Sequence, residues 1–537
     1  MIPPRTLLAL AVFVAFPAIA RQAGEADPEP EAPTLEARAG ELQRRIAELA
    51  AVDPMQPEAL EARMDYARLL HNEAAADCAP QLDEAERQLA PILEAGREHH
   101  LAWPDGLGDA LSLMQSIQNT RGLCAGSETA ARAAFEAAIA TGTRAIEVLR
   151  ENWDYEEMAI AQFNLGFARR ELGDRQGALR DLEQVIAWDL EFGLRDDLED
   201  DYSTLVRWEN GEDPDPEDVR QFVGSYNQAR ARFRFAWKPY RATWTTQVDR
   251  AVLKQGVVQS VAARHASEVV ARQERDDWVI STRAVGRADI EAPDIRASGV
   301  SAEVLQELLG GAALAFPDVV LAADGSFKQV RNLEAFRTAL AAAIDRALAQ
   351  ALPAGAPGPA PGIAEAVKTA ALNPELLAAT IGARWDFAIA AWTDSELDHG
   401  DWYEGTVEEP LPGISKRPVR MTWRFKVARW LPCAAGREPA CVELLVRVEP
   451  DPAQMREVTA ELIGRMVPAA DRARWEQAAR EVSLRIEQRY RLITEPDTLR
   501  PWSVEERKYV YGSFIEEGKR GVSARYDRTL ETVQYLE

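Results

Sequence analysis

The chain has 537 residues, of which 47% are hydrophobic and 28% charged, and its formal net charge is −25. Because folded domains average roughly 100–200 residues, this length indicates about three domains. Each is large enough to bury a core without disulfide or metal support. A surface this acidic repels nucleic acid and anionic lipid, which argues against both as partners.

The N-terminus has the pattern of a signal peptide. Arg5 precedes an apolar run over 7–16, and residues 18–20 (Ala-Ile-Ala) form a small-x-small cleavage site. The run is too short to span a bilayer, and no later stretch is apolar enough to do so. We therefore expect a periplasmic or secreted protein with a signal peptide over 1–20. A disordered, Pro/Glu-rich linker over 21–34 follows, and the mature chain has no transmembrane segment.

Helical periodicity dominates residues 35–195 and predicts a series of amphipathic helices. The clearest stripe steps by three and four residues along one helix face: Met158, Ala161, Leu165, Ala168 and Leu172. Asp154 and Glu157 have the spacing of a capping box at the start of this helix.

The segment that follows resembles a tetratricopeptide repeat over about 155–190. The matching residues are Asn164-Leu165-Gly166, Gly173-Asp174, Ala178 and Leu182. The resemblance implies a helix pair in which Gly166 and Ala178 lie at the close contact, with Leu165 and Leu182 beside them and Gly173 ending the first helix.

The match has three departures: Arg169 replaces the usual aromatic, Val185 the usual alanine, and Leu190 the usual proline. Earlier hairpins agree in length and period but not in motif. We therefore predict an all-α, repeat-like domain of three helix pairs over 35–195.

Residues 196–225 are densely acidic and are interpreted as a linker or as an acidic cap on the last repeat; no calcium-loop spacing occurs in them. After about residue 226 the apolar period changes from 3.6 to 2, which predicts long strands. The predicted elements of this part are strands over 242–254, 257–272 and 278–290, a hairpin over 319–330 that turns at Asp324-Gly325, and a helix over 333–350.

A Pro/Gly/Ala stretch over 352–362 is the clearest linker in the chain. Strands return beyond it over 419–427, 442–448, 482–492, 506–515 and 521–535. The fold class is therefore a helical-repeat domain followed by α+β regions with long antiparallel strands, over 226–351 and 363–537. Whether these two regions form one sheet or two domains stays open.

The four cysteines form two local groups, which favours the disulfides Cys78–Cys124 and Cys433–Cys441 in an oxidising compartment. Cys78 and Cys124 lie in equivalent loops of the first two predicted helix pairs. Cys433 and Cys441 lie between two strands, where a disulfide closes the mouth of a hairpin.

Standard catalytic motifs are absent, and the chain has only five histidines. No cofactor or metal site is predicted. The best catalytic candidates are Asp398, His399 and Asp401, a carboxylate–imidazole group next to tryptophans that suits acid–base chemistry. A polar loop with flanking core aromatics explains them more simply. Adjacent His99 and His100 point to different helix faces, which disfavours joint ligation.

Three functions fit this organisation. The first is a non-catalytic binding or scaffold protein whose helical repeats hold a protein partner. The second is a carrier or sensor of an apolar ligand held on the strand-rich half, whose long amphipathic strands and tryptophans suit an open cup. The third is a hydrolase that uses the carboxylates near 394–401. The sequence ranks them in this order.

Overall fold

The computed structural model describes the chain in segments. These are residues 34–52, 54–74, 80–95, 100, 103–225, 229–254, 257–291, 316–351, 368–369, 372–411, 415–434, 439–466, 483–516 and 519–536. The predicted signal peptide, the segment 21–33 and the predicted linker 352–362 lie outside them, as do Cys78 and His99. Two compact units divide the chain, a helical unit over 25–229 and a sheet unit over 230–537.

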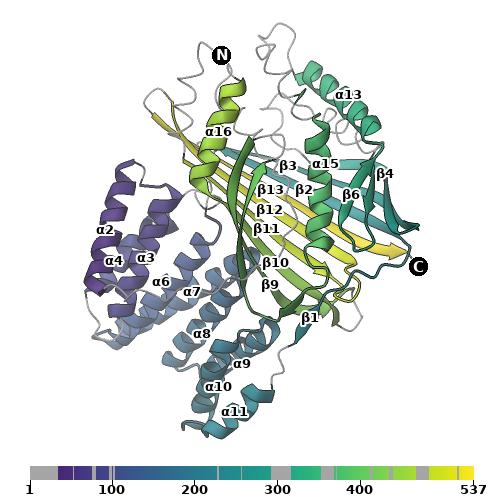
Figure 1. The fold of residues 1–537 in the computed structure, drawn as a ribbon. Helices are drawn as coiled ribbons and strands as arrows, with labels where there is room; N and C mark the ends of the chain where they lie inside the picture. Colours follow the sequence, from purple (N-terminus) through teal and green to yellow (C-terminus); the bar gives the residue numbers. More distant parts are fainter. Residues whose placement is uncertain are drawn as a thin grey trace. The chain divides into compact units, whose positions relative to one another are not determined.

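The helical unit is a succession of helices, as the apolar periodicity predicts (Figure 1). Each helix packs mainly on its sequence neighbours. The described helices are α2 (Leu35–Val52), α3 (Pro57–Ala74), α4 (Gln81–Leu93), α6 (Gly106–Leu123), α7 (Glu128–Asn152), α8 (Tyr155–Glu171), α9 (Arg175–Phe192), α10 (Arg195–Asn210) and α11 (Pro216–Ser225).

Helices two apart in sequence are joined by buried polar groups. Gln115 and Asn119 of α6 donate to the backbone carbonyls of Ala161 and Asn164 on α8, at 3.0 and 2.9 Å. A buried amide without a partner would destabilise the fold by roughly 1–3 kcal/mol, so these bonds fix how α6 and α8 align.

The α8–α9 pair contains the segment that resembles a tetratricopeptide repeat. A Cβ on Gly166 would lie 3.2 Å from the carbonyl oxygen of Ala178, so the two helices approach closely there. Gly173 has φ +86° after α8, and Leu165 and Leu182 are buried. The unusual Arg169 binds both oxygens of the buried Asp181 on α9 at 2.6 Å, so an ion pair stands where the pattern has an aromatic.

The acidic segment is helical, as α10 and α11, and α10 packs on α9, so the linker prediction is wrong and the alternative of a cap on the last repeat is the better description. Leu198 and Trp208 of α10 are buried, and Tyr202 stacks on Phe222 of α11 with ring centroids 3.9 Å apart. These apolar residues recur at helical spacing among the acids, and Gly211 at φ +79° ends α10. Burial of that stripe, rather than the charge density, decides the structure.

The sheet unit contains one antiparallel sheet of eleven described strands, in the order β6-β5-β4-β3-β2-β13-β12-β11-β10-β9-β8. The first five in chain order are β2 (Tyr240–Lys254), β3 (Val257–Glu274), β4 (Asp277–Glu291), β5 (Asp318–Leu321) and β6 (Phe327–Arg331). The other six are β8 (Tyr403–Leu411), β9 (Ser415–Pro432), β10 (Pro439–Pro450), β11 (Ser483–Thr494), β12 (Pro501–Glu516) and β13 (Lys519–Leu536).

Both strand-rich regions of the sequence contribute to this sheet. The last strand, β13, pairs with β2 over Ser523–Leu536 and Arg241–Lys254 and so joins the two regions at the middle of the sheet (Figure 1). The predicted strands and the Asp324-Gly325 hairpin are present, with Gly325 at φ +84°. A separate two-stranded sheet pairs β1 (Arg230–Arg232) with β7 (Glu396–Asp398).

One face of the large sheet, here called the inner face, carries the apolar core. It includes Val427, Leu444 and Leu492, which lie opposite one another on β9, β10 and β11. Glu443, next to Leu444, lies on the outer face, and the register shift between Glu443 and Leu444 places Arg429 opposite it on that face. Among the described residues, the longer helical segments of this unit are α13 (Leu333–Ala351), α15 (Pro374–Trp385) with the π-helical turn η2 (Asp386–Ala390), and α16 (Pro452–Met466).

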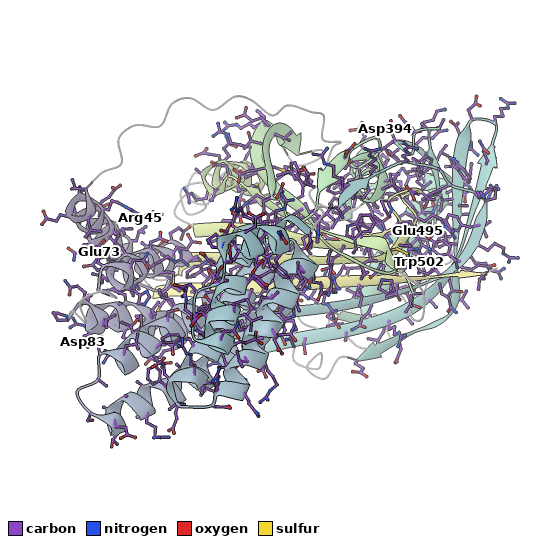
Figure 2. The ribbon with its side chains drawn as sticks, turned by 90° about the horizontal axis from the view of Figure 1, so that it is seen from below. Arg45, Glu73, Asp83, Asp394, Glu495 and Trp502 are labelled. Carbon is purple, nitrogen blue, oxygen red and sulfur yellow. A yellow bond between two sulfur atoms is a disulfide. The ribbon has the colours of Figure 1, made fainter. Side chains whose placement is uncertain are left out.

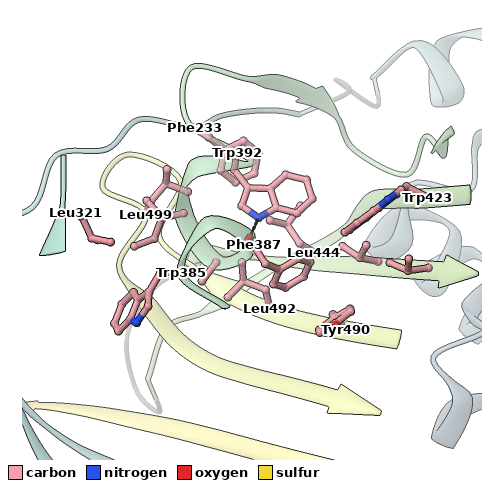
Figure 3. Close-up of a cluster of buried hydrophobic side chains, with 14 of the residues drawn as sticks. Phe233, Leu321, Trp385, Phe387, Trp392, Trp423, Leu444, Tyr490, Leu492 and Leu499 are labelled. Carbon is pink, nitrogen blue, oxygen red and sulfur yellow. Dashed lines mark hydrogen bonds between the residues drawn. The ribbon is translucent and has the colours of Figure 1, made fainter. Parts of the chain in front are cut away.

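Aromatic residues anchor α15 and η2 to the inner face (Figure 3). Phe387 packs on Tyr490 of β11 with ring centroids 4.3 Å apart, and Trp385 packs on Trp244 of β2 at 5.7 Å. The indole of Trp392 donates to the carbonyl of Phe387 at 2.7 Å, which satisfies the buried N–H.

A side-chain hydrogen bond joins the two ends of the β11–β12 turn. The Trp502 indole donates to Glu495 at 3.0 Å (Figure 2). Leu499, between these two residues in the sequence, has φ +57°. Leu499 is itself fully buried and accepts a hydrogen bond from the Trp237 indole through its carbonyl. The turn is thereby held against the same core as α15.

Candidate ligand-binding cavities on the inner face of the sheet

The inner face of the sheet changes from aromatic to charged side chains along the length of its strands. At one end it carries the aromatic residues that pack on α15; further along it carries charged residues on β2, β12 and β13. The register shows this directly, because Trp244 on β2 lies opposite Val533, whereas Arg250 lies opposite Asp527 and Asp527 opposite Lys508. Two cavities, one mainly apolar and one mainly charged, follow this division.

The apolar cavity has a volume of about 280 Å³ and lies between the sheet, α13 and α15. Seven of its sixteen lining residues are polar or charged, among them Thr246, Thr282 and His265, and burial and Arg384 lower the pKa of His265. Its apolar lining consists of Trp244, Val269, Phe316, Pro317, Val319, Phe336, Leu377, Ile381 and Trp385. An apolar wall with a few polar groups is the usual composition of a small-molecule site.

The charged cavity has a volume of about 260 Å³ and lies under the same helix. Its floor includes Tyr490, whose hydroxyl lies 3.4 Å from a carboxylate oxygen of Glu506. The charged side chains that line it are Arg250, Arg384, Glu506, Lys508, Arg525, Asp527 and Glu531.

Arg384 of α15 lies where the two cavities meet, because it lines both, as does Glu531. Its guanidinium forms an ion pair with Glu531 and lies 5.4 Å from the ring centroid of Trp244. Burial lowers the pKa of Arg384 to about 10 although 47% of its side-chain surface is accessible. Both observations fit a guanidinium that faces enclosed cavities instead of bulk solvent.

Three cations surround one carboxylate in the charged cavity. Asp527 accepts from Arg250 at 2.5 Å and from Arg525 at 2.6 Å, and Lys508 lies directly opposite it on β12. Burial lowers the pKa of Lys508 to about 8, although Glu506 and Asp527 both favour its charged form. Desolvation of the ammonium therefore outweighs the attraction of the two carboxylates.

The Asp398, His399 and Asp401 group lies away from the residues that line these cavities. Asp398 is bound to Arg230 at 2.5 Å, across the β1–β7 ladder. His399 is buried, with Nε2 3.2 Å from the carbonyl oxygen of Ala428 on β9. Asp401 is exposed. Asp398 and His399 thus hold neighbouring backbone segments together, and the hydrolase hypothesis gains no support from this geometry.

The predicted cysteine pairs have different outcomes. Cys433 and Cys441 form a disulfide with their Cα atoms 5.0 Å apart, and it closes the β9–β10 hairpin as expected. Cys124 is also disulfide-bonded. Because Cys78 lies outside the described residues, the Cys78–Cys124 pairing stays a prediction.

The helical unit has a groove of its own, between α4 and α6. It has a volume of about 650 Å³ and an apolar floor that includes Leu93 and Met114. Arg121 bridges Asp83 and Glu86 along its side, at 2.6 and 2.8 Å. The whole unit is strongly acidic, with 44 Asp and Glu against 18 Arg and no Lys over 25–229.

Sequence reasoning missed every charged residue of the sheet cavities. One signal was present: Glu506 and Lys508 share their parity with Val504 and Val510, so charges interrupt an apolar face. Tyr509 and Tyr511 on the other face of β12 made that alternation harder to recognise. The sequence did point to the tryptophans of the strand-rich half, of which Trp244 and Trp278 are core residues.

Comparisons with known proteins identify no family for this chain. No protein-family model matches it, and no curated protein matches it by sequence. Among solved structures, one match is a lipovitellin structure entitled "Lipid-protein interactions in lipovitellin", at 8% identity and a TM-score of 0.25. The match covers 55% of this chain and 25% of that chain, and a TM-score this low does not indicate a shared fold.

Two further observations concern the described residues alone. None of their helices combines the length and apolarity needed to cross a bilayer. They also contain no cluster of three or more His, Cys, Asp or Glu side chains placed to hold a metal ion.

Proposed function

We propose that the sheet unit carries or senses an apolar small molecule, which it binds between α15 and the inner face of the sheet. The observation that carries this proposal is the apolar cavity lined by two tryptophans, two phenylalanines and aliphatic side chains. Together with the adjoining charged cavity it falls within the range of about 300–1,000 Å³ that is typical of ligand sites.

The burial of the lining explains how the cavity persists. Trp244 and Trp385 are both buried and packed on each other, so they belong to the core and hold their positions without a ligand. A preformed apolar pocket loses little conformational entropy on binding, which favours a carrier or sensor over a surface that must fold around its ligand.

The test is saturable binding of a neutral, apolar fluorescent probe, N-phenyl-1-naphthylamine, to the full chain. We expect a single site whose occupancy quenches tryptophan fluorescence. Thr282→Phe fills the cavity from β4 and should weaken binding at least 10-fold. Arg283→Phe places the same ring on the neighbouring, exposed residue of that strand and should leave binding unchanged.

A second measurement looks for the natural ligand. Organic extracts of the natively purified protein, compared by mass spectrometry with extracts of Thr282→Phe, should contain a compound that the variant lacks. Unsaturable probe binding, or equal binding by both phenylalanine variants, would contradict the proposal.

Protein binding by the helical unit is the second candidate, and its net charge is the observation that favours it. An excess of acidic over basic residues this large attracts a basic partner over long range. The full chain as bait should capture a basic protein in a salt-sensitive manner, and Glu86→Lys in the α4–α6 groove should reduce that capture. Capture that is insensitive to both salt and the substitution would remove this candidate.

We further propose that the protein works outside the cytoplasm, in the periplasm or secreted. The Cys433–Cys441 disulfide supports this location, because structural disulfides persist in oxidising compartments. A fusion to a reporter that is active only after export should be active, and removal of residues 1–20 should abolish that activity.

A further inference from the structure

The polar side chains of the apolar cavity fall into two groups, those that already have partners and those that do not. Arg384 forms an ion pair with Glu531, and the Thr380 hydroxyl donates to the Leu376 carbonyl of its own helix at 2.8 Å. In the described part of the chain, the other four side chains have no hydrogen-bond partner: Thr246, His265, Ser267 and Thr282. The cavity therefore offers a ligand three hydroxyl groups and one imidazole for hydrogen bonding.

The charges of the apolar cavity cancel. Arg384 and Glu531 contribute one positive and one negative charge and are bound to each other. Burial, together with the positive charge of Arg384, lowers the pKa of His265, so its imidazole is uncharged at neutral pH. An ionised headgroup in this cavity would lose its hydration without gaining a counter-ion, which is strongly unfavourable. A neutral polar group that is hydrogen-bonded there does not meet this cost.

Strand register brings two of the polar groups without partners together on the floor of the cavity. His265 on β3 lies directly opposite Thr246 on β2. Both line the cavity from the inner face, on which Trp244, two residues from Thr246, belongs to the core. Side chains in such cross-strand pairs have Cβ atoms about 4.5–5.5 Å apart, so one polar group of a ligand can contact both.

The sheet is irregular at His265 on the side away from Thr246. The β3–β4 ladder has a register shift between Arg264 and Ala266, and in the described ladder His265 has no partner residue on β4. Gly286, in the β4 segment that faces this shift, has φ +76°. Bulges of this kind are over-represented next to active sites, where they redirect a side chain. The bulge is a second observation, independent of the cavity, that singles out the position of His265.

We propose that the ligand of the apolar cavity is a neutral alcohol whose hydroxyl group binds to His265 and Thr246, while its hydrocarbon body packs on the aromatic and aliphatic lining. This inference rests on the proposed function and names its ligand class. A neutral imidazole offers one N–H donor and one acceptor nitrogen. A hydroxyl group also donates and accepts, so it can satisfy the acceptor nitrogen, whereas an ether or ester oxygen only accepts.

The experiment measures how four molecules of equal chain length displace N-phenyl-1-naphthylamine from the full-length protein: decanol, decyl methyl ether, decanoate and decylamine. We expect decanol to bind about 5-fold more tightly than decyl methyl ether, the factor that corresponds to one hydrogen bond. Decanoate and protonated decylamine should bind more weakly than decanol by about 10-fold or more, because Arg384 and Glu531 already neutralise each other.

Two variants locate the hydroxyl group of the ligand. His265→Phe keeps a ring but removes both nitrogens, and Thr246→Val replaces the side-chain hydroxyl with a methyl group. Each should reduce the preference for decanol over the ether to about 2-fold while ether binding stays unchanged, which also shows that the variant is folded. Thr245→Val is the matched control. It makes the same change at the next residue of β2, whose side chain lies on the outer face, and should preserve the preference.

The two proposals fail in different ways. If neither the naphthylamine nor any competitor binds, the proposed function is wrong. If decyl methyl ether binds as tightly as decanol, or if either His265→Phe or Thr246→Val retains the full preference, the apolar site stands and the hydroxyl assignment is wrong. Tighter binding of decanoate or decylamine than of decanol would also overturn the assignment, in favour of an ionised headgroup that displaces one partner of the Arg384–Glu531 pair.

Discussion

Asp189 on α9 and Asp201 on α10 are two carboxyl groups buried against each other, with 1% and 8% of their surface exposed. Burial and the proximity of Asp201 raise the pKa of Asp189 to about 9, and the pKa of Asp201 rises to about 6. At neutral pH the Asp189 carboxyl is therefore protonated and donates to the Asp201 carboxylate. The pair holds α9 and α10 together through one shared proton.

This proton predicts a pH dependence of stability. The unfolded chain releases the Asp189 proton near its ordinary pKa of 3.8, whereas the folded chain keeps it up to about pH 9. Unfolding thus releases a proton in this window, so the free energy of unfolding falls as pH rises from about 4 to 9. Asp189→Asn keeps the hydrogen bond without a titrating proton and should flatten this dependence.

The measurement is the thermal midpoint of the helical signal by circular dichroism between pH 5 and 9. We expect Asp189→Asn to be more stable than the wild type at pH 8 by on the order of 2 kcal/mol, because each pKa unit corresponds to about 1.4 kcal/mol. Glu199→Gln, at an exposed carboxylate on α10, is the control and should follow the wild type. Equal pH profiles for all three proteins would show that the Asp189 pKa is not raised.

At the scale of single elements, the close contact of α8 and α9 depends on the missing side chain of Gly166. A Cβ there would lie 3.0 Å from the Asp181 Cβ and 3.2 Å from the Ala178 carbonyl oxygen. Gly166→Val should destabilise the protein by about 1–3 kcal/mol through overpacking. Gly40→Val on α2 is the matched control, because nothing lies within 4 Å of its Cβ. Urea unfolding followed at 222 nm measures both, and equal midpoints would argue against a tight contact.

The Cys433–Cys441 disulfide restrains the β9–β10 hairpin, whose strands are paired from Pro439 opposite Pro432 to Pro450 opposite Met421. Replacing both cysteines with alanine should lower the free energy of unfolding of the sheet unit by about 2 kcal/mol, the value for closing a short loop. Substitution is preferred to chemical reduction, since Cys124 is disulfide-bonded as well. An unchanged urea midpoint in the sheet unit would mean that strand pairing alone holds the hairpin.

The elements themselves were largely predictable from the sequence, for physical reasons. Met158 to Leu172 repeat every three or four residues and become α8, and Val419 to Val427 alternate and become part of β9. The acidic α10 was missed because its buried Leu198 and Trp208 are few among many charges. Local patterns report which face is buried, and they weaken when charged residues occupy most positions.

At the scale of the whole molecule, the sheet depends on contacts that local patterns do not encode. The pairing of Arg241 with Leu536 joins residues almost three hundred positions apart, and the two strand-rich regions gave no sign of sharing one sheet. The candidate site shows the same limit. Arg250, Lys508 and Arg384 come from β2, β12 and α15, and only the strand order brings them to one cavity.

The position of β13 leads to a prediction about folding of the sheet unit. Although last in the sequence, β13 lies between β12 and β2, with fourteen residue pairs to each. A chain ending at Glu516 would leave both neighbours as long, unpaired edges, which promote aggregation. We expect this truncation to lose the strand signal and become insoluble, whereas removal of Glu537 alone should have no effect. If the truncated chain instead keeps a cooperative unfolding transition of its strands, the regions before and after residue 360 fold separately. The binding cavities contain residues from both regions, so they would then form only after the two regions have folded.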